Sequence, residues 1–153
     1  MTKQDFIDGL NAKRSNTLKA IDGLSDEDIS RPLAEGKWSI KDTLGHLAAW
    51  EGEVVKGFRQ KANGERPSIS DIKDYDPWNA IETAKRKDLS PDEIRAELME
   101  NRENLLSIIQ AFPEDDEKIW DPARYTAKML GMLMQHDAHH CKAICDYRGT
   151  DVG

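Results

Sequence analysis

The sequence lacks any long hydrophobic run. None of its windows approaches the roughly 20 consecutive apolar residues that a membrane-spanning helix needs. The first ten residues, MTKQDFIDGL, are too polar for the apolar segment of a secretory signal peptide. These absences predict a protein with no membrane partner and a cytoplasmic location.

Basic residues are in the minority. The 153 residues include 22 Lys and Arg against 29 Asp and Glu, which gives a formal net charge of −7, and no basic run stands out. Nucleic-acid-binding proteins draw much of their affinity from neutralising phosphates with Lys and Arg. The composition therefore predicts that nucleic acid is a poor candidate as a partner, although it leaves room for a local basic pocket.

Cysteine is scarce. Cys141 and Cys145, the two that occur, lie four residues apart on one predicted helix. Neighbouring helical turns rarely offer the geometry of a disulfide, and cytosolic thiols are normally reduced. We interpret the pair as small, half-buried residues. A reactive or metal-adjacent thiol is the alternative.

Helical periodicity is what the sequence does contain. Apolar residues recur at helical spacing in four long segments that carry start and stop signals. These run from Lys3 to Asp22, from the cap Ser39 to about Ala62, from the cap Ser90 to Phe112, and from Thr126 to Arg148. No strand candidate competes. We predict an all-α fold, a four-helix bundle that forms a single domain over residues 1–153.

Capping boxes mark three of the predicted helix starts. The pairs are Thr2 with Asp5, Ser39 with Asp42, and Ser90 with Glu93. Shorter features lie between the helices. We expect one short turn capped by Ser25 and a solvated acidic turn over residues 114–118.

The connection between the second and third helices is long. Residues 63–89 are mostly polar and include Pro67 and Pro77, so we expect a partial helix over Trp78–Lys87 and loop elsewhere. Its length suggests a crossover connection rather than a simple up-down-up-down order. A lid over a functional site is the alternative, because long connections often carry function.

All four histidines fall in two predicted helices. His46 lies in GHLAAWE, and His136, His139 and His140 lie in QHDAHHCKAICD. Side chains four residues apart share one face of a helix, so His136 and His140 can direct two imidazoles at one point. A third ring from a facing helix completes a metal site. We therefore predict that His46, His136 and His140 bind one divalent metal. His139 competes with His140 as a ligand, but we favour His140 because its row is expected to face the core, and we place His139 at the rim of the site or behind a ligand.

The chemistry of imidazole supports this interpretation. The row that contains the pair, Met129, Leu133, His136, His140, Ala143 and Tyr147, is expected to face the core. Buried imidazoles need partners, and a transition metal such as zinc or nickel provides one. Three protein ligands with an open position are typical of a catalytic rather than a structural zinc site. No catalytic residue follows from this pattern.

Two acidic residues near the histidines have competing interpretations. His136–His140 also reads as H-D-x-x-H, in which Asp137 would replace the general base of a zinc peptidase. We favour Asp137 and Asp42 as acceptors that orient imidazoles, or as plain surface charges.

The segments GKWSIKDTLGHLAAWE (36–51) and MQHDAHHCKAI (134–144) resemble the DinB/YfiT-like superfamily. Trp78 and Asn79 are also similar to the ClbS/DfsB branch, whose members protect against DNA-damaging metabolites. The resemblance implies a four-helix bundle, a metal site made of His46, His136 and His140, and a homodimer.

The resemblance also implies a range of activities. The leading expectation is a metal-dependent enzyme acting on a small-molecule substrate, a thiol S-transferase or a related detoxification or hydrolytic enzyme. A low-molecular-weight thiol such as bacillithiol or mycothiol would be the cosubstrate. The alternative is a non-catalytic stress or resistance protein that binds a toxic small molecule in the bundle cavity. A third possibility is an interaction module with ordinary core histidines.

Overall fold

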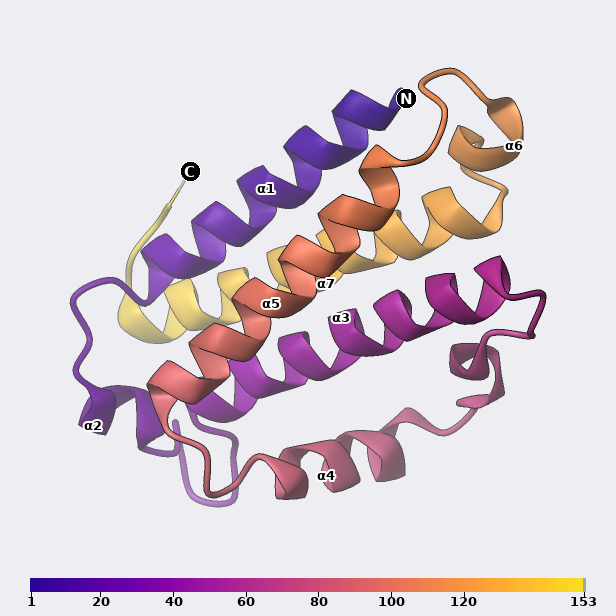
Figure 1. The fold of residues 1–153 in the computed structure, drawn as a ribbon. Coiled ribbons are helices and arrows are strands. Elements are labelled where there is room, and N and C mark those ends of the chain that lie inside the picture. Colours follow the sequence, from indigo (N-terminus) through magenta and orange to yellow (C-terminus); the bar gives the residue numbers. More distant parts are fainter. Residues whose placement is uncertain (153) are drawn as a thin grey trace. The chain divides into compact units, whose positions relative to one another are not determined.

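The computed structural model describes residues 1–152, and the regular structure in that range is helical (Figure 1). This confirms the all-α prediction. None of the described helices is both long and apolar enough to cross a membrane. The elements in chain order are α1 (Lys3–Ala20), α2 (Asp26–Ser30), α3 (Ile40–Ala62), the 3₁₀ helix η1 (Ser68–Asp71), α4 (Tyr75–Lys85), α5 (Pro91–Gln110), α6 (Glu117–Trp120) and α7 (Tyr125–Arg148).

The chain forms two compact units. The first joins Met1–Leu24 to Leu106–Gly153 and contains α1, α6 and α7, and the second is Ser25–Leu105 and contains α2, α3, η1 and α4. Helix α5 contributes residues to both. The single domain over residues 1–153 remains a prediction.

The helix starts follow the caps that the sequence predicts. At the start of α1, the Thr2 amide donates to Asp5 Oδ2 over 2.7 Å and the Asp5 amide donates to Thr2 Oγ1 over 3.2 Å. The same reciprocal pair of bonds satisfies amides that have no intrahelical partner at α2, α3 and α5. The residues are Ser25 with Asp28, Ser39 with Asp42, and Ser90 with Glu93.

Helices α1 and α7 pack side by side and run parallel in the first unit (Figure 1). Gly9 lies against the Met134 side chain, where an added Cβ would come within 2.5 Å of the sulfur. Further along, Arg148 Nη1 donates to the Ala20 carbonyl over 2.7 Å. From the first contact to the second, the residue number increases on α1 and also on α7. The two helices therefore run in the same direction. A glycine at position 9 is what lets them approach so closely.

Helices α3 and α5 also run parallel, in the second unit. A Cβ at Gly45 would lie 3.5 Å from Ile94, and two turns later Arg102 Nε donates to Glu51 Oε1 over 2.6 Å. Two parallel helices that follow one another need a connection that returns the whole helix length. The crossover between the second and third long helices is therefore confirmed.

The returning connection carries more helix than the sequence predicts. The polar stretch forms η1, and α4 begins at Tyr75, three residues before the predicted start at Trp78. Pro77 does not prevent this early start. It lies in the first turn, where the missing amide hydrogen has no intrahelical partner to lose.

The predicted core-facing row of α7 is wrong in its C-terminal half. Ala143 is exposed and Tyr147 is 54% exposed, while His136 and His140 are half-buried. The buried stripe of α7 is a different one, made of Leu130, Leu133, Asp137, Cys141, Ile144 and Cys145. The expected row fails because helical spacing gives candidate faces, and the contact with α1 determines which of them is covered.

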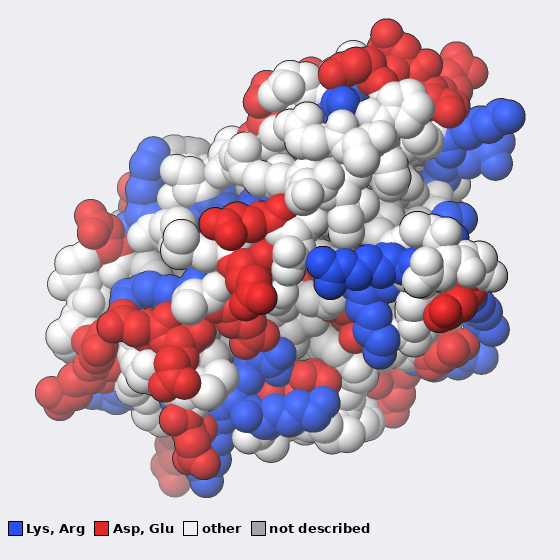
Figure 2. Space-filling view, in the orientation of Figure 1, with Lys and Arg blue, Asp and Glu red and all other residues white. Residues whose placement is uncertain are grey.

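The acidic stretch at residues 114–118 is only partly a solvated turn. Its acidic side chains gather at the upper right of Figure 2. From Glu117 the chain forms α6, capped by the Asp116 carboxylate, which accepts from the Lys118 amide over 2.9 Å. Trp120 at its end is 4% exposed and stacks on Phe6 with ring centroids 5.6 Å apart. The buried indole anchors this turn on α1.

Candidate metal centre

His136 and His140 form an imidazole pair on one face of α7. Their ring centroids lie 4.8 Å apart and their planes are inclined by 73°. Both side chains are half-buried. The spacing of four residues has therefore placed the two rings one turn apart, as the sequence predicts.

Burial keeps both rings neutral. It lowers the pKa of His136 from its ordinary value of 6.5 to about 4, against a smaller opposing effect of Asp137. Burial, together with a smaller effect of the neighbouring imidazoles, lowers the pKa of His140 to about 4 as well. At neutral pH each ring therefore carries a nitrogen lone pair. An unprotonated nitrogen is the form of histidine that ligates metals.

His46 lies on α3 in the second unit and is 7% exposed. The Trp38 indole covers it, with ring centroids 4.8 Å apart. Trp38 is fixed just before α3 because its carbonyl accepts from the Leu33 amide over 3.1 Å and because Pro32 bridges Ser39. The loop thus places an aromatic ring where it restricts the orientation of this imidazole.

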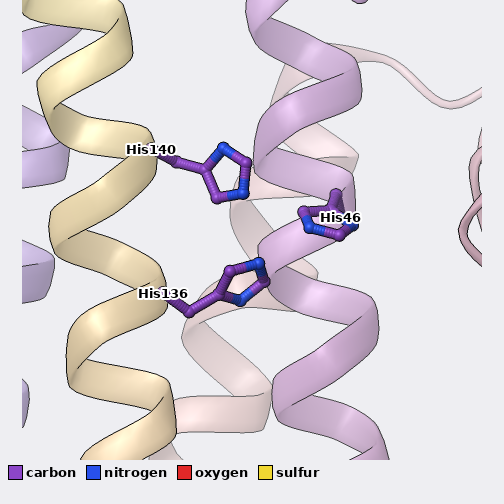
Figure 3. A group of neighbouring side chains, drawn as sticks. All are labelled: His46, His136 and His140. Atoms are coloured by element: carbon purple, nitrogen blue, oxygen red, sulfur yellow. The ribbon is translucent and has the colours of Figure 1, made fainter. Parts of the chain in front are cut away.

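Figure 3 draws the three predicted ligands, with His136 and His140 on α7 and His46 on α3. His139 also lies on α7, but it is exposed. Its ring centroid is 5.0 Å from that of His140. This position fits the rim residue that the sequence suggests better than it fits a ligand. The assignment of His46, His136 and His140 as metal ligands remains a prediction.

Asp137 has a structural role that the sequence does not reveal. It is 1% exposed and accepts from Arg14 Nε over 3.1 Å and from Arg14 Nη2 over 3.2 Å. The Thr17 hydroxyl donates to the same carboxylate over 3.1 Å. A carboxylate committed to a guanidinium fork is a poor general base, so the peptidase-like interpretation loses its catalytic group. Asp42 is likewise committed, because it completes the capping box of α3 with Ser39.

Cys141 faces α1. Together with Cys145 it lines a cavity that Lys13 and Asn16 of α1 also line. Both cysteines belong to the buried stripe of α7. The two thiols therefore lie on a different face of α7 from the imidazole pair.

Helix α4 is fastened to its own unit at both ends. Near its start, Trp50 Nε1 donates to Asn79 Oδ1 over 2.9 Å, and the Trp50 and Trp78 rings lie 4.3 Å apart. At its end, Arg86 Nη2 donates to Glu97 Oε2 over 2.7 Å. These contacts favour the crossover interpretation of this segment over a lid.

Two buried ion pairs were not predicted from the sequence. They are Arg14 with Asp137 in the first unit and Arg102 with Glu51 in the second. Glu51 is fully buried. One signal in the sequence could have predicted the burial of Glu51. It lies one turn after Leu47 and three residues before Val54, on the apolar face of α3. The arginine partners carry no comparable signal.

A solved structure shares this fold. The crystal structure of the colibactin self-resistance protein ClbS in complex with a dsDNA is similar to this chain, with a TM-score of 0.79 and 16% sequence identity. The match covers 98% of this chain and 97% of that one. The helical-bundle prediction is thereby confirmed. None of the curated proteins compared matches the chain.

The prediction that nucleic acid is a poor partner is wrong. ClbS, a protein with this helical fold, is described in complex with a dsDNA. The prediction rested on the net charge of −7, which is a sum over the whole chain. Affinity for phosphates depends on where Lys and Arg gather locally, and a sum does not report this. Figure 2 shows side chains of both signs interspersed on one face.

The sequence itself identifies the family. The profile of the DinB superfamily matches residues 10–144, which include the imidazole pair, His46 and all of the crossover connection. The match thus covers most of the 153 residues. The chain belongs to the DinB superfamily.

Proposed function

We propose that the protein is a metal-dependent enzyme acting on a small molecule, with His46, His136 and His140 as the metal ligands. These three side chains are a group that could hold a metal ion. The observation that carries the proposal is the imidazole pair of α7, whose members have pKa values lowered to about 4 by burial. A neutral ring binds a metal without first losing a proton.

The donor set fits a divalent transition metal. Three imidazole nitrogens suit zinc or nickel better than they suit magnesium or calcium, which prefer oxygen ligands. A metal held this way keeps a position open, and when bound it supplies a Lewis acid that activates water or a thiol. The most specific activity that we propose is thiol S-transfer from a low-molecular-weight thiol to an electrophile, or a related detoxification or hydrolytic reaction.

The chain's own residues prepare the ligands. Trp38 covers the His46 ring and limits its rotation. Arg14 and Thr17 hold the Asp137 carboxylate on the α1 side of α7, and this bond network fixes the helix that carries the imidazole pair. A ligand set that is rigid before the metal arrives loses less entropy on binding.

A second candidate is a non-catalytic resistance protein that binds a toxic small molecule. The likeness to ClbS favours it, since that protein is described as a self-resistance protein. In this case the metal is structural or incidental. The dsDNA in the ClbS structure makes double-stranded DNA a second ligand class to test with this chain.

A turnover assay separates the two candidates. Protein loaded with zinc or nickel is mixed with a monothiol and an electrophilic aromatic halide, and product is followed against a chelator-treated sample. The enzyme proposal predicts metal-dependent turnover that His136→Ala abolishes and His139→Ala, the matched exposed control, retains. Stoichiometric binding of the electrophile without turnover would favour the resistance protein.

A further inference from the structure

The two cysteines lie in a cavity that the proposed enzyme does not use. It has a volume of about 410 Å³ and belongs to the first unit. Its lining residues include Cys141 and Cys145, Lys13 and Asn16 from α1, and Lys142 and Asp146 from α7. The chain segment after α7 forms its remaining wall. The thiols are therefore next to a space that a small species can enter.

The spacing of the thiols favours binding an ion between them over forming a disulfide. Side chains four residues apart on a helix have Cβ atoms about 5–6 Å apart. A disulfide needs about 3.5–4.5 Å between Cβ atoms, so it would distort α7. An ion with bonds of about 2.3 Å to each sulfur spans a wider gap than a disulfide does.

We propose that Cys141 and Cys145 chelate one soft, thiophilic ion of the trivalent arsenic class. Soft ions prefer thiolate ligands, whereas the imidazole pair suits zinc or nickel. The charges around the cavity are balanced, since its lining holds two lysines, Lys13 and Lys142, and two aspartates, Asp146 and Asp151. Lys142 Nζ pairs with Asp146 Oδ2 over 2.6 Å. A neutral arsenic(III) species meets no net charge there. The site is separate from the proposed metal centre because the thiols occupy the α1-facing stripe of α7.

The chemistry of binding balances without an oxidant. Phenylarsine oxide presents arsenic bound to one phenyl group and one oxygen. Two arsenic–sulfur bonds form, the arsenic–oxygen bonds break, and both thiol protons leave with the oxygen as water.

Intact-mass spectrometry of the folded full chain tests the proposal. The protein is treated with one equivalent of phenylarsine oxide and then with a large excess of a monothiol. A chelate of two thiolates resists this exchange, whereas an adduct on one thiol is removed. We expect wild type to retain one phenylarsenic group and the Cys141→Ala and Cys145→Ala variants to lose it.

Two further measurements keep the result decisive if a variant folds poorly. His136→Ala should retain the phenylarsenic group as wild type does, since the imidazoles take no part. Diamide should leave the wild-type thiols free of an intramolecular disulfide. Loss of the arsenic group from wild type, or its loss in His136→Ala, would overturn the proposal. Rapid formation of the Cys141–Cys145 disulfide would overturn its geometric basis.

Discussion

The two faces of α7 hold polar groups in different ways. On the face towards α1, the Asp137 carboxylate is 1% exposed and has a charged partner, Arg14, and a hydroxyl donor, Thr17. On the other face, His136 and His140 are half-buried and lose their charge instead. A buried carboxylate that keeps its charge depends on its partner, because removing either member leaves the other buried and unpaired. A buried imidazole that is kept neutral has a basic nitrogen that is ready to bind a metal.

Breaking the charged pair should give the largest loss of stability. Asp137→Ala leaves Arg14, a residue that is 8% exposed, without this carboxylate. We expect the free energy of unfolding to fall by about 3–5 kcal/mol, because a buried charge loses its partner. Urea unfolding measures this loss. The matched control is Arg14→Met with Asp137→Leu, which removes both charges and should recover most of the stability; an equally unstable double variant would contradict the account.

The imidazole face should appear as a pH dependence of stability in the metal-free protein. The folded pKa values of His136 and His140, about 4, lie below the ordinary value of 6.5. Between these values the unfolded chain binds more protons than the folded chain, so stability falls as the pH falls from 6.5 to about 4. Above 6.5 both states are neutral at these rings and the contribution is constant.

Unfolding by urea at a series of pH values tests this dependence. The His136→Gln, His140→Gln double variant is the control, because carboxylates also titrate towards pH 4. The double variant should lose less stability than wild type over the same interval. Identical slopes for the two proteins would show that the rings are not held neutral by burial.

A smaller effect is expected on the α1-facing side. Thr17→Val keeps the shape of the side chain but removes the hydroxyl that donates to Asp137 Oδ1 over 3.1 Å. A hydrogen bond to a charged group contributes about 1.5–3 kcal/mol, and the Arg14 fork remains in this variant. We expect a loss near the lower value in the same unfolding assay. A neutral substitution would mean that Arg14 alone satisfies the carboxylate.

The smallest effect belongs to His139. This ring is exposed, so His139→Ala should change the free energy of unfolding by no more than about 0.5 kcal/mol. The metal content of the His139→Ala variant should equal that of wild type. A variant that lost metal would move His139 from the rim into the ligand set.

The sequence was sufficient for features that depend on local patterns. Ser39 with Asp42 and Ser90 with Glu93 cap their helices as predicted, because a capping box is read from residues three apart. The one-turn spacing of His136 and His140 needed only helical geometry. The parallel course of α3 and α5 followed from the length of the connection between them.

The features that were missed depend on contacts between distant residues. Asp137 finds Arg14 from 123 positions away, and no local pattern marks such a partner. For the same reason the helical spacing places the exposed Tyr147 in the core, since only the packing of α7 on α1 shows which stripe is covered. The homodimer, the thiol cosubstrate and the cytoplasmic location remain predictions.

Metal content measures the central claim most directly. Untagged protein, purified without chelators, is analysed for transition metals in wild type, in the ligand variants His46→Ala, His136→Ala and His140→Ala, and in the control His139→Ala. The account predicts near-stoichiometric zinc or nickel in wild type and in the control, and its loss from all three ligand variants. A wild-type protein that is free of metal and does not take up zinc or nickel would contradict it.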